Sequence, residues 1–295
     1  MNDFKSIRKL GVAMAFSGMM SPASAADLSQ SLSQAMSGGA CRTPDTVSLD
    51  KATSLFGRNF AGDFAKSTLQ DWSRLNMQAL TPSGESRPGL KAVMETSTAH
   101  TGRGFYAFST VTGKPWVLQA PHGNDDLHTK TIALNLFREG LFAAAAWNTL
   151  PRNALVDGGP ELADLAHLSN SYYQAFTRAF AQRYPEGRLI QIHGFDKNKR
   201  STVAGATSDM IVSAGVEQAT PWVVQVADCL KTKMPGVVRL YPIDVQELGG
   251  TTNAQKKLLQ QLGHTGFMHV EMSENMRLRL RDDAVVRRDF IGCLR

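Results

Sequence analysis

The pattern of apolar and polar positions predicts strands and helices that follow one another along most of the chain. Short apolar runs bounded by Gly, Pro, Asn or Asp are typical of buried strands, and apolar residues three or four positions apart indicate amphipathic helices. Strands are predicted at 104–109, 116–119, 189–195, within 202–213, at 237–241 and at 266–272. Helices are predicted within 50–80, at 128–138, 162–183, 221–230 and 255–262, and from 282 onward. Residues 141–147 fit either more helix or a buried strand.

This order of elements predicts an α/β fold of three layers. Strands separated by helical patterns favour a mostly parallel or mixed central sheet with helices on both faces, as in phosphorylase- or hydrolase-like folds. We assign residues 46–295 to a single domain, which is an ordinary size for this architecture. Residues 26–45 are rich in Ser, Gln, Ala and Gly, and we expect a flexible lead-in there.

The first 25 residues have the pattern of a cleavable signal peptide. Lys5, Arg8 and Lys9 precede a short apolar run, and Ala23-Ser24-Ala25 forms an A-x-A cleavage site. The apolar run is too short to span a bilayer, and no later stretch is long and apolar enough. We therefore expect a periplasmic or secreted protein without a membrane span.

Charge and cysteine content narrow the class of partner. Removing residues 1–25 takes away three basic residues and one acidic residue, so the formal net charge falls from +6 to +4. No basic stripe with interleaved aromatic residues is present, so nucleic acid is not an expected partner. An oxidising compartment allows one disulfide among Cys41, Cys229 and Cys293, and we favour Cys229 with Cys293.

Histidine and carboxylate side chains follow three of the predicted buried strands. His122 precedes Asp125 and Asp126 after the second strand, His193 ends the strand at 189–195, and Glu271 lies in the strand at 266–272. Because the ends of parallel strands lie along one edge of a sheet, these residues can converge. Two histidines and one carboxylate bind Zn²⁺ and leave a fourth position for water.

Glu271 is the candidate for the proton transfer that such a site requires. It lies between the apolar residues Val270 and Met272, where a structural role would usually be filled by a residue that costs less to bury. A carboxylate beside the metal accepts a proton from water and passes it to the leaving amine. The alternative for the His122 loop is a polar turn whose aspartates cap the next helix.

These motifs resemble the zinc carboxypeptidase-like enzymes. His122-Gly123-Asn124-Asp125 is similar to the His-Gly-Asn-Glu loop of the succinylglutamate desuccinylase and aspartoacylase family. Ile192-His193-Gly194 and His269-Val270-Glu271 resemble the later metal histidine and the general-base glutamate, and residues 270–277 resemble N-formylglutamate amidohydrolases. The resemblance spans about residues 105–290. Here the metal carboxylate is Asp in place of Glu, and the spacing favours Asp125, with Asp126 as the close second.

The resemblance also implies an arginine that holds a substrate carboxylate. Arg152 is similar in position to the arginine of this group, and Arg277 and Arg138 are alternates. The alternative for each is a solvated surface arginine. The guanidinium group makes two parallel hydrogen bonds to a carboxylate, which suits a small-molecule or peptide substrate with a free carboxylate.

Two functions are compatible with the sequence. The first is an exported zinc metallohydrolase, either an amidohydrolase or a carboxypeptidase-like enzyme, that cleaves an amide bond in an N-acyl amino acid or peptide with metal-activated water. The second is a non-catalytic secreted binding protein on a degenerate form of the same scaffold. A serine hydrolase is disfavoured because the sequence has no G-x-S-x-G motif. The sequence does not specify the oligomeric state.

Overall fold

A computed structural model of the chain describes residues 26–36, 39–64, 72–80, 86–96, 101–111, 113–140 and 142–295. The predicted signal peptide lies outside the described residues. The strands are β1 Ala26–Asp27, β2 Trp72–Leu80, β3 Ser86–Glu95, β4 Phe105–Ser109, β5 Lys114–Ala120, β6 Phe142–Trp147, β7 Arg188–Gly194, β8 Met210–Ser213, β9 Val238–Leu240 and β10 Phe267–Met272. The helices are α1 Leu28–Ala35, α2 Thr46–Phe60, α3 Thr129–Glu139, α4 Tyr172–Arg183, α5 Val203–Thr207, α6 Pro221–Lys233, α7 Ala254–Gln261, α8 Glu274–Asp282 and α9 Ala284–Cys293, with a 3₁₀ turn at Lys197–Lys199.

The described strands form one mixed sheet in the order β1-β2-β3-β4-β6-β5-β7-β10-β8-β9. Its centre, β6-β5-β7-β10, is parallel, while β4 joins β6 and β8 joins β10 in antiparallel pairs. Central strands such as β5 and β7 are buried over most of their length, as expected where helices cover both faces. The parallel centre therefore aligns the carboxyl ends of β5, β7 and β10 along one edge.

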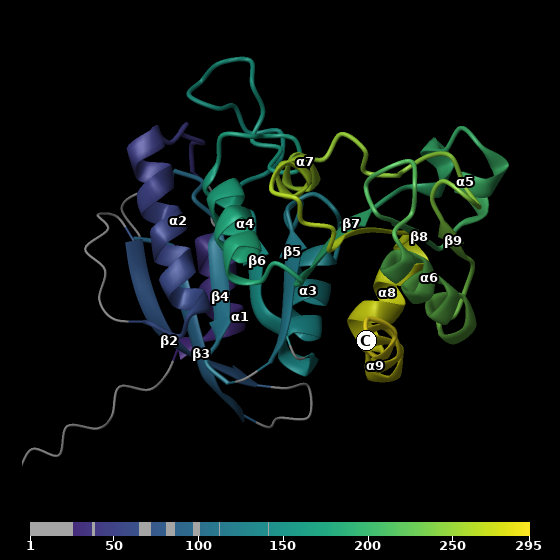
Figure 1. Cartoon of the computed structure of the whole chain (residues 1–295), viewed down its shortest axis with the longest axis horizontal. Coiled ribbons are helices and arrows are strands. Elements are labelled where there is room, and N and C mark those ends of the chain that lie inside the picture. The colour runs from purple at the N-terminus through teal and green to yellow at the C-terminus, as the bar shows by residue number, and fades with distance from the viewer. Residues whose placement is uncertain are drawn as a thin grey trace, which may run out of the picture.

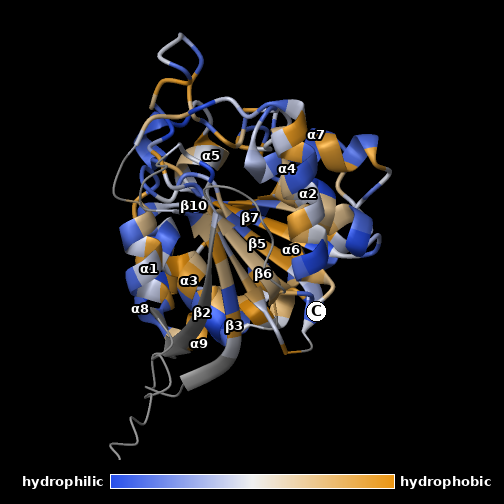
Figure 2. Cartoon of the chain, turned by 90° about the vertical axis from the view of Figure 1, so that its left-hand side faces the viewer, coloured by the Kyte–Doolittle hydropathy of each residue, from blue (hydrophilic) through white to orange (hydrophobic). Residues whose placement is uncertain are grey.

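Helices cover both faces of the sheet, so the predicted three-layer α/β class is confirmed. Helices α1, α3, α6, α8 and α9 bury apolar residues against one face, and α2, α4 and α7 against the other. Figure 2 shows α1, α3 and α8 on one side of the strands and α2, α4 and α7 on the other. Helices α2 and α4 lie side by side in Figure 1, and Phe56 packs edge-on against Phe176 between them.

The segment that was predicted to be a flexible lead-in contains a strand and a helix. Ala26 and Asp27 pair with β2, and the Asp27 side chain caps α1 by accepting a hydrogen bond from Gln30 N. Leu28 and Leu32 are fully buried in the core. The polar composition concealed an amphipathic helix whose two leucines lie four positions apart on one face.

Two predicted helices differ from the structure because their apolar residues belong to other elements. Trp72 lies within the range predicted as helix, but it belongs to strand β2 and packs from there against Phe56 of α2. The predicted helix at 162–183 begins only at Tyr172, where the Ser171 side chain accepts a hydrogen bond from Gln174 N. Before it, the carbonyls of Ala163 and Leu165 accept hydrogen bonds from side chains outside the helix. Residues 142–147 form strand β6.

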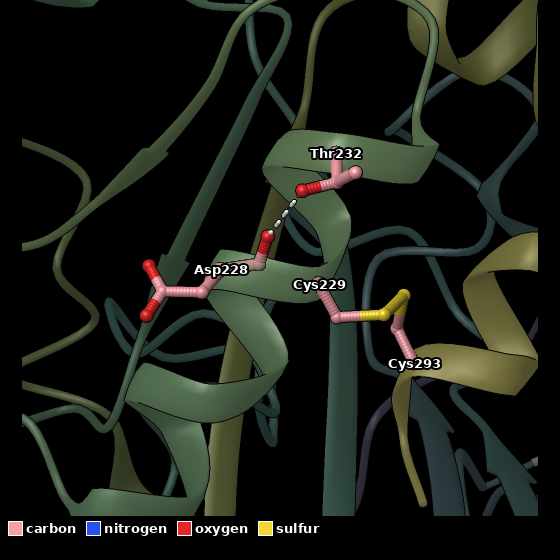
Figure 3. Close-up of a disulfide and its surroundings, with 4 residues drawn as sticks. All are labelled: Asp228, Cys229, Thr232 and Cys293. Carbon is pink, nitrogen blue, oxygen red and sulfur yellow. Dashed lines mark hydrogen bonds between the residues drawn. A yellow bond between two sulfur atoms is a disulfide. The ribbon is translucent and has the colours of Figure 1, made fainter.

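The carboxyl-terminal region forms two helices in place of the one that was predicted. Asp283 separates α8 from α9 and caps α9 by accepting hydrogen bonds from Val285 N and Val286 N. The predicted disulfide between Cys229 and Cys293 is present and joins α6 to α9 (Figure 3). Cys41 is a buried free thiol. No helix within the described ranges is both long and apolar enough to cross a bilayer.

Candidate metal centre

Three neighbouring parallel strands bring the predicted site residues to one edge of the sheet. His122 follows the end of β5 by two positions, and His193 and Glu271 are register partners near the ends of β7 and β10. Since β7 lies between β5 and β10, His193 lies between the other two residues. The edge on which the sequence placed the chemistry is therefore the edge where these side chains meet.

His122, Asp126 and His193 converge as a group of three potential metal ligands. His122 Nδ1 lies 3.1 Å from His193 Nδ1, and Asp126 Oδ2 lies 3.4 Å from the first nitrogen and 3.7 Å from the second. Two ligands bonded to Zn²⁺ at about 2.0–2.1 Å in tetrahedral geometry are about 3.3 Å apart. The three atoms thus already have the spacing that one small tetrahedral cation requires.

Each histidine has a partner on the ring nitrogen that faces away from the group. His122 Nε2 lies 2.8 Å from Asp164 Oδ1, and His193 Nε2 lies 2.9 Å from Gln191 Oε1. Both partner atoms are oxygens, so each Nε2 donates a proton to its partner, and Nδ1 is the nitrogen of each ring that faces the group and can bind a cation once it is unprotonated. Such outward hydrogen bonds orient metal-binding histidines in proteins generally.

Charges in the group are strongly coupled in the metal-free protein. Burial lowers the pKa of His122, but hydrogen bonds to Asp126 and Asp164 outweigh it and raise the pKa to about 9. Burial lowers the pKa of His193 to about 4, so this ring is neutral at neutral pH. Burial raises the pKa of Asp126, but hydrogen bonds from the two histidines outweigh it, and the carboxylate is ionised.

The structure distinguishes the two adjacent aspartates. Asp126 Oδ2 faces both histidines and accepts a hydrogen bond from Gly194 N at 2.9 Å. Asp125 points elsewhere, and its Oδ2 accepts a hydrogen bond from the backbone N of Arg152 at 2.8 Å. The preference for Asp125 was based on spacing alone. The geometry favours the close second, Asp126, because the turn after His122 brings the fourth following residue back toward the ring.

Glu271 lies beside this group with an unsatisfied carboxylate oxygen. The residue is buried, and Oε2 has no hydrogen-bond partner within the described part of the chain. Burial, and then the negative charge of Asp126, raise the pKa of Glu271 to about 8. His269, two residues earlier on β10, stacks on His193 and places Nε2 3.4 Å from Glu271 Oε1 without hydrogen-bond geometry.

A second group of potential ligands, His193, His269 and Glu271, is not independent of the first. It shares His193, whose Nε2 is bound to Gln191 and whose Nδ1 faces His122. With the first group occupied, only His269 and Glu271 remain, which is too few ligands for a protein zinc site.

A polar cavity of about 760 Å³ opens over the site. Its wall includes Asp126, Glu271 and two of the predicted arginines, Arg152 and Arg277. The side chain of Arg152 is 40% exposed and pairs with Asp164. Arg277 is buried and donates hydrogen bonds from Nη1 to the carbonyls of Met272 and Phe195, which fixes it across the strand ends.

Arg138, the other alternate, lies away from the cavity. It belongs to the last turn of α3, and its Nη2 lies 3.8 Å from Asp27 Oδ2. Helix α3 starts at the site edge of the sheet and runs toward the opposite edge, so ten residues carry Arg138 about 15 Å along it. Its place in the sequence, soon after the His122 loop, was therefore misleading.

No known family profile and no curated protein sequence matches the chain. Solved structures do. The fold is similar to N-formylglutamate amidohydrolase from Ralstonia eutropha, with 13% identity, a TM-score of 0.39, and coverage of 62% of this chain and 92% of that one.

Two other solved structures are similar to the chain at a comparable level. An aspartoacylase family protein from Mesorhizobium loti has 14% identity and a TM-score of 0.38, with coverage of 77% of this chain and 68% of that one. A candidate carboxypeptidase from Burkholderia mallei has 13% identity and a TM-score of 0.40. The match covers 80% of this chain and 65% of that protein's length.

Proposed function

We propose that this chain is an exported zinc-dependent hydrolase of amide bonds in N-acyl amino acids or peptides. The observation that carries the proposal is the convergence of His122 Nδ1, His193 Nδ1 and Asp126 Oδ2 to 3.1–3.7 Å of one another. Two imidazole nitrogens and one carboxylate oxygen with that spacing suit a divalent cation, and this combination of ligands suits zinc in particular. Zinc held by these three residues would have room for a water molecule as its fourth ligand.

The residues of this chain divide the chemistry between them. His122, His193 and Asp126 would hold the zinc, which supplies a Lewis acid for the scissile carbonyl and lowers the pKa of a water molecule. Glu271, with its unpaired oxygen, accepts the proton of the attacking water and delivers it to the leaving amine. A cation beside Glu271 lowers its pKa from about 8 and so favours the ionised base at neutral pH.

Arg152 is the residue that would hold a carboxylate of the substrate. It lies on the cavity wall, its side chain remains partly exposed, and its backbone N is fixed by Asp125. A guanidinium group so placed orients the substrate by paired hydrogen bonds. The cavity is large enough for a substrate of several residues, which includes a peptide as well as a single N-acyl amino acid.

Hydrolysis assays test the proposal directly. We expect the purified protein to release amino acid from at least one member of a panel of N-acyl amino acids and short peptides. A chelator should remove the activity and zinc should restore it. A protein that binds zinc but hydrolyses no member of such a panel would favour the alternative, a binding protein on the same scaffold.

Zinc binding should release protons and strengthen with pH. In the metal-free protein His122 has a pKa of about 9. Its ring must lose one proton before Nδ1 can bind zinc while Nε2 donates a hydrogen bond to Asp164. Below pH 9, lowering the pH by one unit therefore weakens the apparent affinity for zinc about tenfold, because His122 must first be deprotonated. Isothermal titration at pH 7 in two buffers of different ionisation enthalpy measures the protons released.

The control for this titration removes the other group with a raised pKa. In the Glu271→Gln variant residue 271 cannot titrate. Any proton that this variant releases when it binds zinc therefore comes from the group of His122, Asp126 and His193. About one proton is expected at pH 7. Zinc uptake by this variant with no proton release would contradict the raised pKa of His122 in the metal-free protein.

Export through a cleaved leader is part of the proposal and has its own test. The small residues Ala23 and Ala25 suit signal peptidase, so the mature chain should start at Ala26. Amino-terminal sequencing of protein recovered from the periplasm or the medium should read Ala26-Asp27-Leu28. Recovery only from the cytoplasm, with the leader intact, would contradict export.

A further inference from the structure

A layer of buried amide side chains lies directly beneath the candidate metal centre. Gln119 on β5, Gln191 on β7 and Gln255 on α7 are fully buried, and Asn253 at the start of α7 is 3% exposed. Polar side chains in a packed interior are costly unless their hydrogen bonds are satisfied. The four residues are linked to one another, and one of them, Gln191, contacts the ring of His193.

Gln191 makes four hydrogen bonds, two from each end of its amide. Its Nε2 lies 2.9 Å from Gln119 Oε1 and 3.0 Å from Gln255 Oε1. Its Oε1 lies 2.5 Å from Asn253 Nδ2 and 2.9 Å from His193 Nε2. An amide nitrogen has two protons and an amide oxygen two lone pairs, so the group is fully used.

Two backbone groups fix the direction of this amide. Asn253 Oδ1 accepts a hydrogen bond from Lys256 N as the cap of α7, so its NH₂ group must be the end that faces Gln191. Gln255 Nε2 donates to the carbonyl of Leu165, so its oxygen must face Gln191. Backbone N–H and C=O groups cannot exchange roles. Gln191 therefore has its nitrogen toward Gln255 and its oxygen toward Asn253 and His193.

We propose that Gln191 is a positioning residue that holds His193 as the Nε2–H tautomer and so keeps its Nδ1 lone pair directed at His122 and Asp126. The oxygen of Gln191 can only accept, so the nitrogen of His193 that it meets must carry the proton. The inference rests on the proposed zinc site for its functional meaning, but the tautomer itself is a property of the metal-free protein.

The same layer also supports the other histidine. Leu165, whose carbonyl anchors Gln255, directly follows Asp164, and Asp164 Oδ1 lies 2.8 Å from His122 Nε2. On its far side the layer ends on α4, where Gln119 Nε2 donates to Thr177 Oγ1 at 3.1 Å. The layer thus holds the outward nitrogen of His193 directly through Gln191, and it anchors the segment that carries Asp164, the partner of His122 Nε2.

Nitrogen NMR of the metal-free protein tests the tautomer without any substitution. Two-bond ¹⁵N–¹H correlation spectra at neutral pH distinguish an imidazole protonated on Nε2 from one protonated on Nδ1. We expect the resonances of His193 to show the proton on Nε2. A wild-type spectrum with the proton on Nδ1 would overturn the proposal even if the protein proves to bind zinc.

Two matched variants then test what the tautomer does. Gln191→Met keeps the length of the side chain but cannot accept from His193. It should bind zinc about 10–100-fold more weakly, the usual effect of removing the group that orients a metal ligand. Gln119→Met removes a neighbour of the same type and burial but leaves the bond between Gln191 and His193, and it should keep the wild-type tautomer and nearly wild-type zinc affinity.

The outcomes separate this inference from the proposed function. Unchanged zinc affinity in Gln191→Met, or an equal loss in Gln119→Met, would overturn the positioning role. If the wild-type protein takes up no zinc, the proposed function fails, while the NMR spectrum still decides the tautomer. Because the wild-type spectrum needs no substitution, it also decides the tautomer where Gln191→Met folds poorly.

Discussion

Glu271→Gln is expected to lower the rate of amide hydrolysis by about 10²–10⁴-fold, the usual contribution of a general base, while zinc stays bound. The substitution preserves the size of the side chain and removes only its ability to accept a proton. Glu271 contributes none of the three ligand atoms, which belong to His122, Asp126 and His193, so the zinc affinity should change little. The measurement is kcat on an active substrate together with the zinc content of the same preparation.

The control for this experiment is Glu217→Gln, an exposed glutamate on the loop after β8. It makes the same chemical change outside the cavity, and its kcat should match that of the wild type. If Glu271→Gln retained nearly full activity with zinc bound, another group would have to carry the proton. If it lost zinc, Glu271 would be a ligand in place of a base.

Asp126→Asn is expected to reduce zinc affinity far more than Asp125→Asn. The first substitution replaces a charged oxygen between His122 and His193 with a neutral amide, and a ligand change should exceed the about 10–100-fold cost of changing an orienting group. The second removes charge from an oxygen that accepts a hydrogen bond from Arg152 N, outside the group. Competition with a chromophoric chelator measures both affinities on one scale.

The pair of variants is its own control, because the two residues are adjacent and chemically identical. The folded state of each can be compared by thermal unfolding in the presence of a chelator. Greater loss of zinc affinity in Asp125→Asn than in Asp126→Asn would return the ligand to the residue that the spacing favoured and would contradict the arrangement described here.

Periodicity predicted the central strands because these are buried on both sides. Strands β5, β7 and β10 are short apolar runs, which the interior of a three-layer fold requires. Periodicity failed where apolar residues from different elements pack into the same core. Trp72 lies within the range that the spacing assigned to a helix, but it belongs to strand β2 and reaches Phe56 of α2 from there. Single-sequence periodicity detects burial, and it does not distinguish the element that buries the residue.

The site was predictable to the extent that parallel strands end together. His122, His193 and Glu271 were found because each follows or ends an apolar run, and topology does the rest. Asp164 was missed because it lies in a loop that the pattern assigned to a helix, and nothing nearby marks it. Gln191 had a signal: it is a polar residue in a buried strand, two positions before His193 and so on the same face.

The location of bound zinc tests the account most directly. A crystal of the protein grown with zinc and measured on both sides of the zinc absorption edge gives the position of the metal independently of the protein density. We predict one strong anomalous peak about 2.0–2.2 Å from His122 Nδ1, His193 Nδ1 and Asp126 Oδ2. A protein that takes up no zinc, or a peak that lies away from these three atoms, would contradict the metal centre and the hydrolase that depends on it.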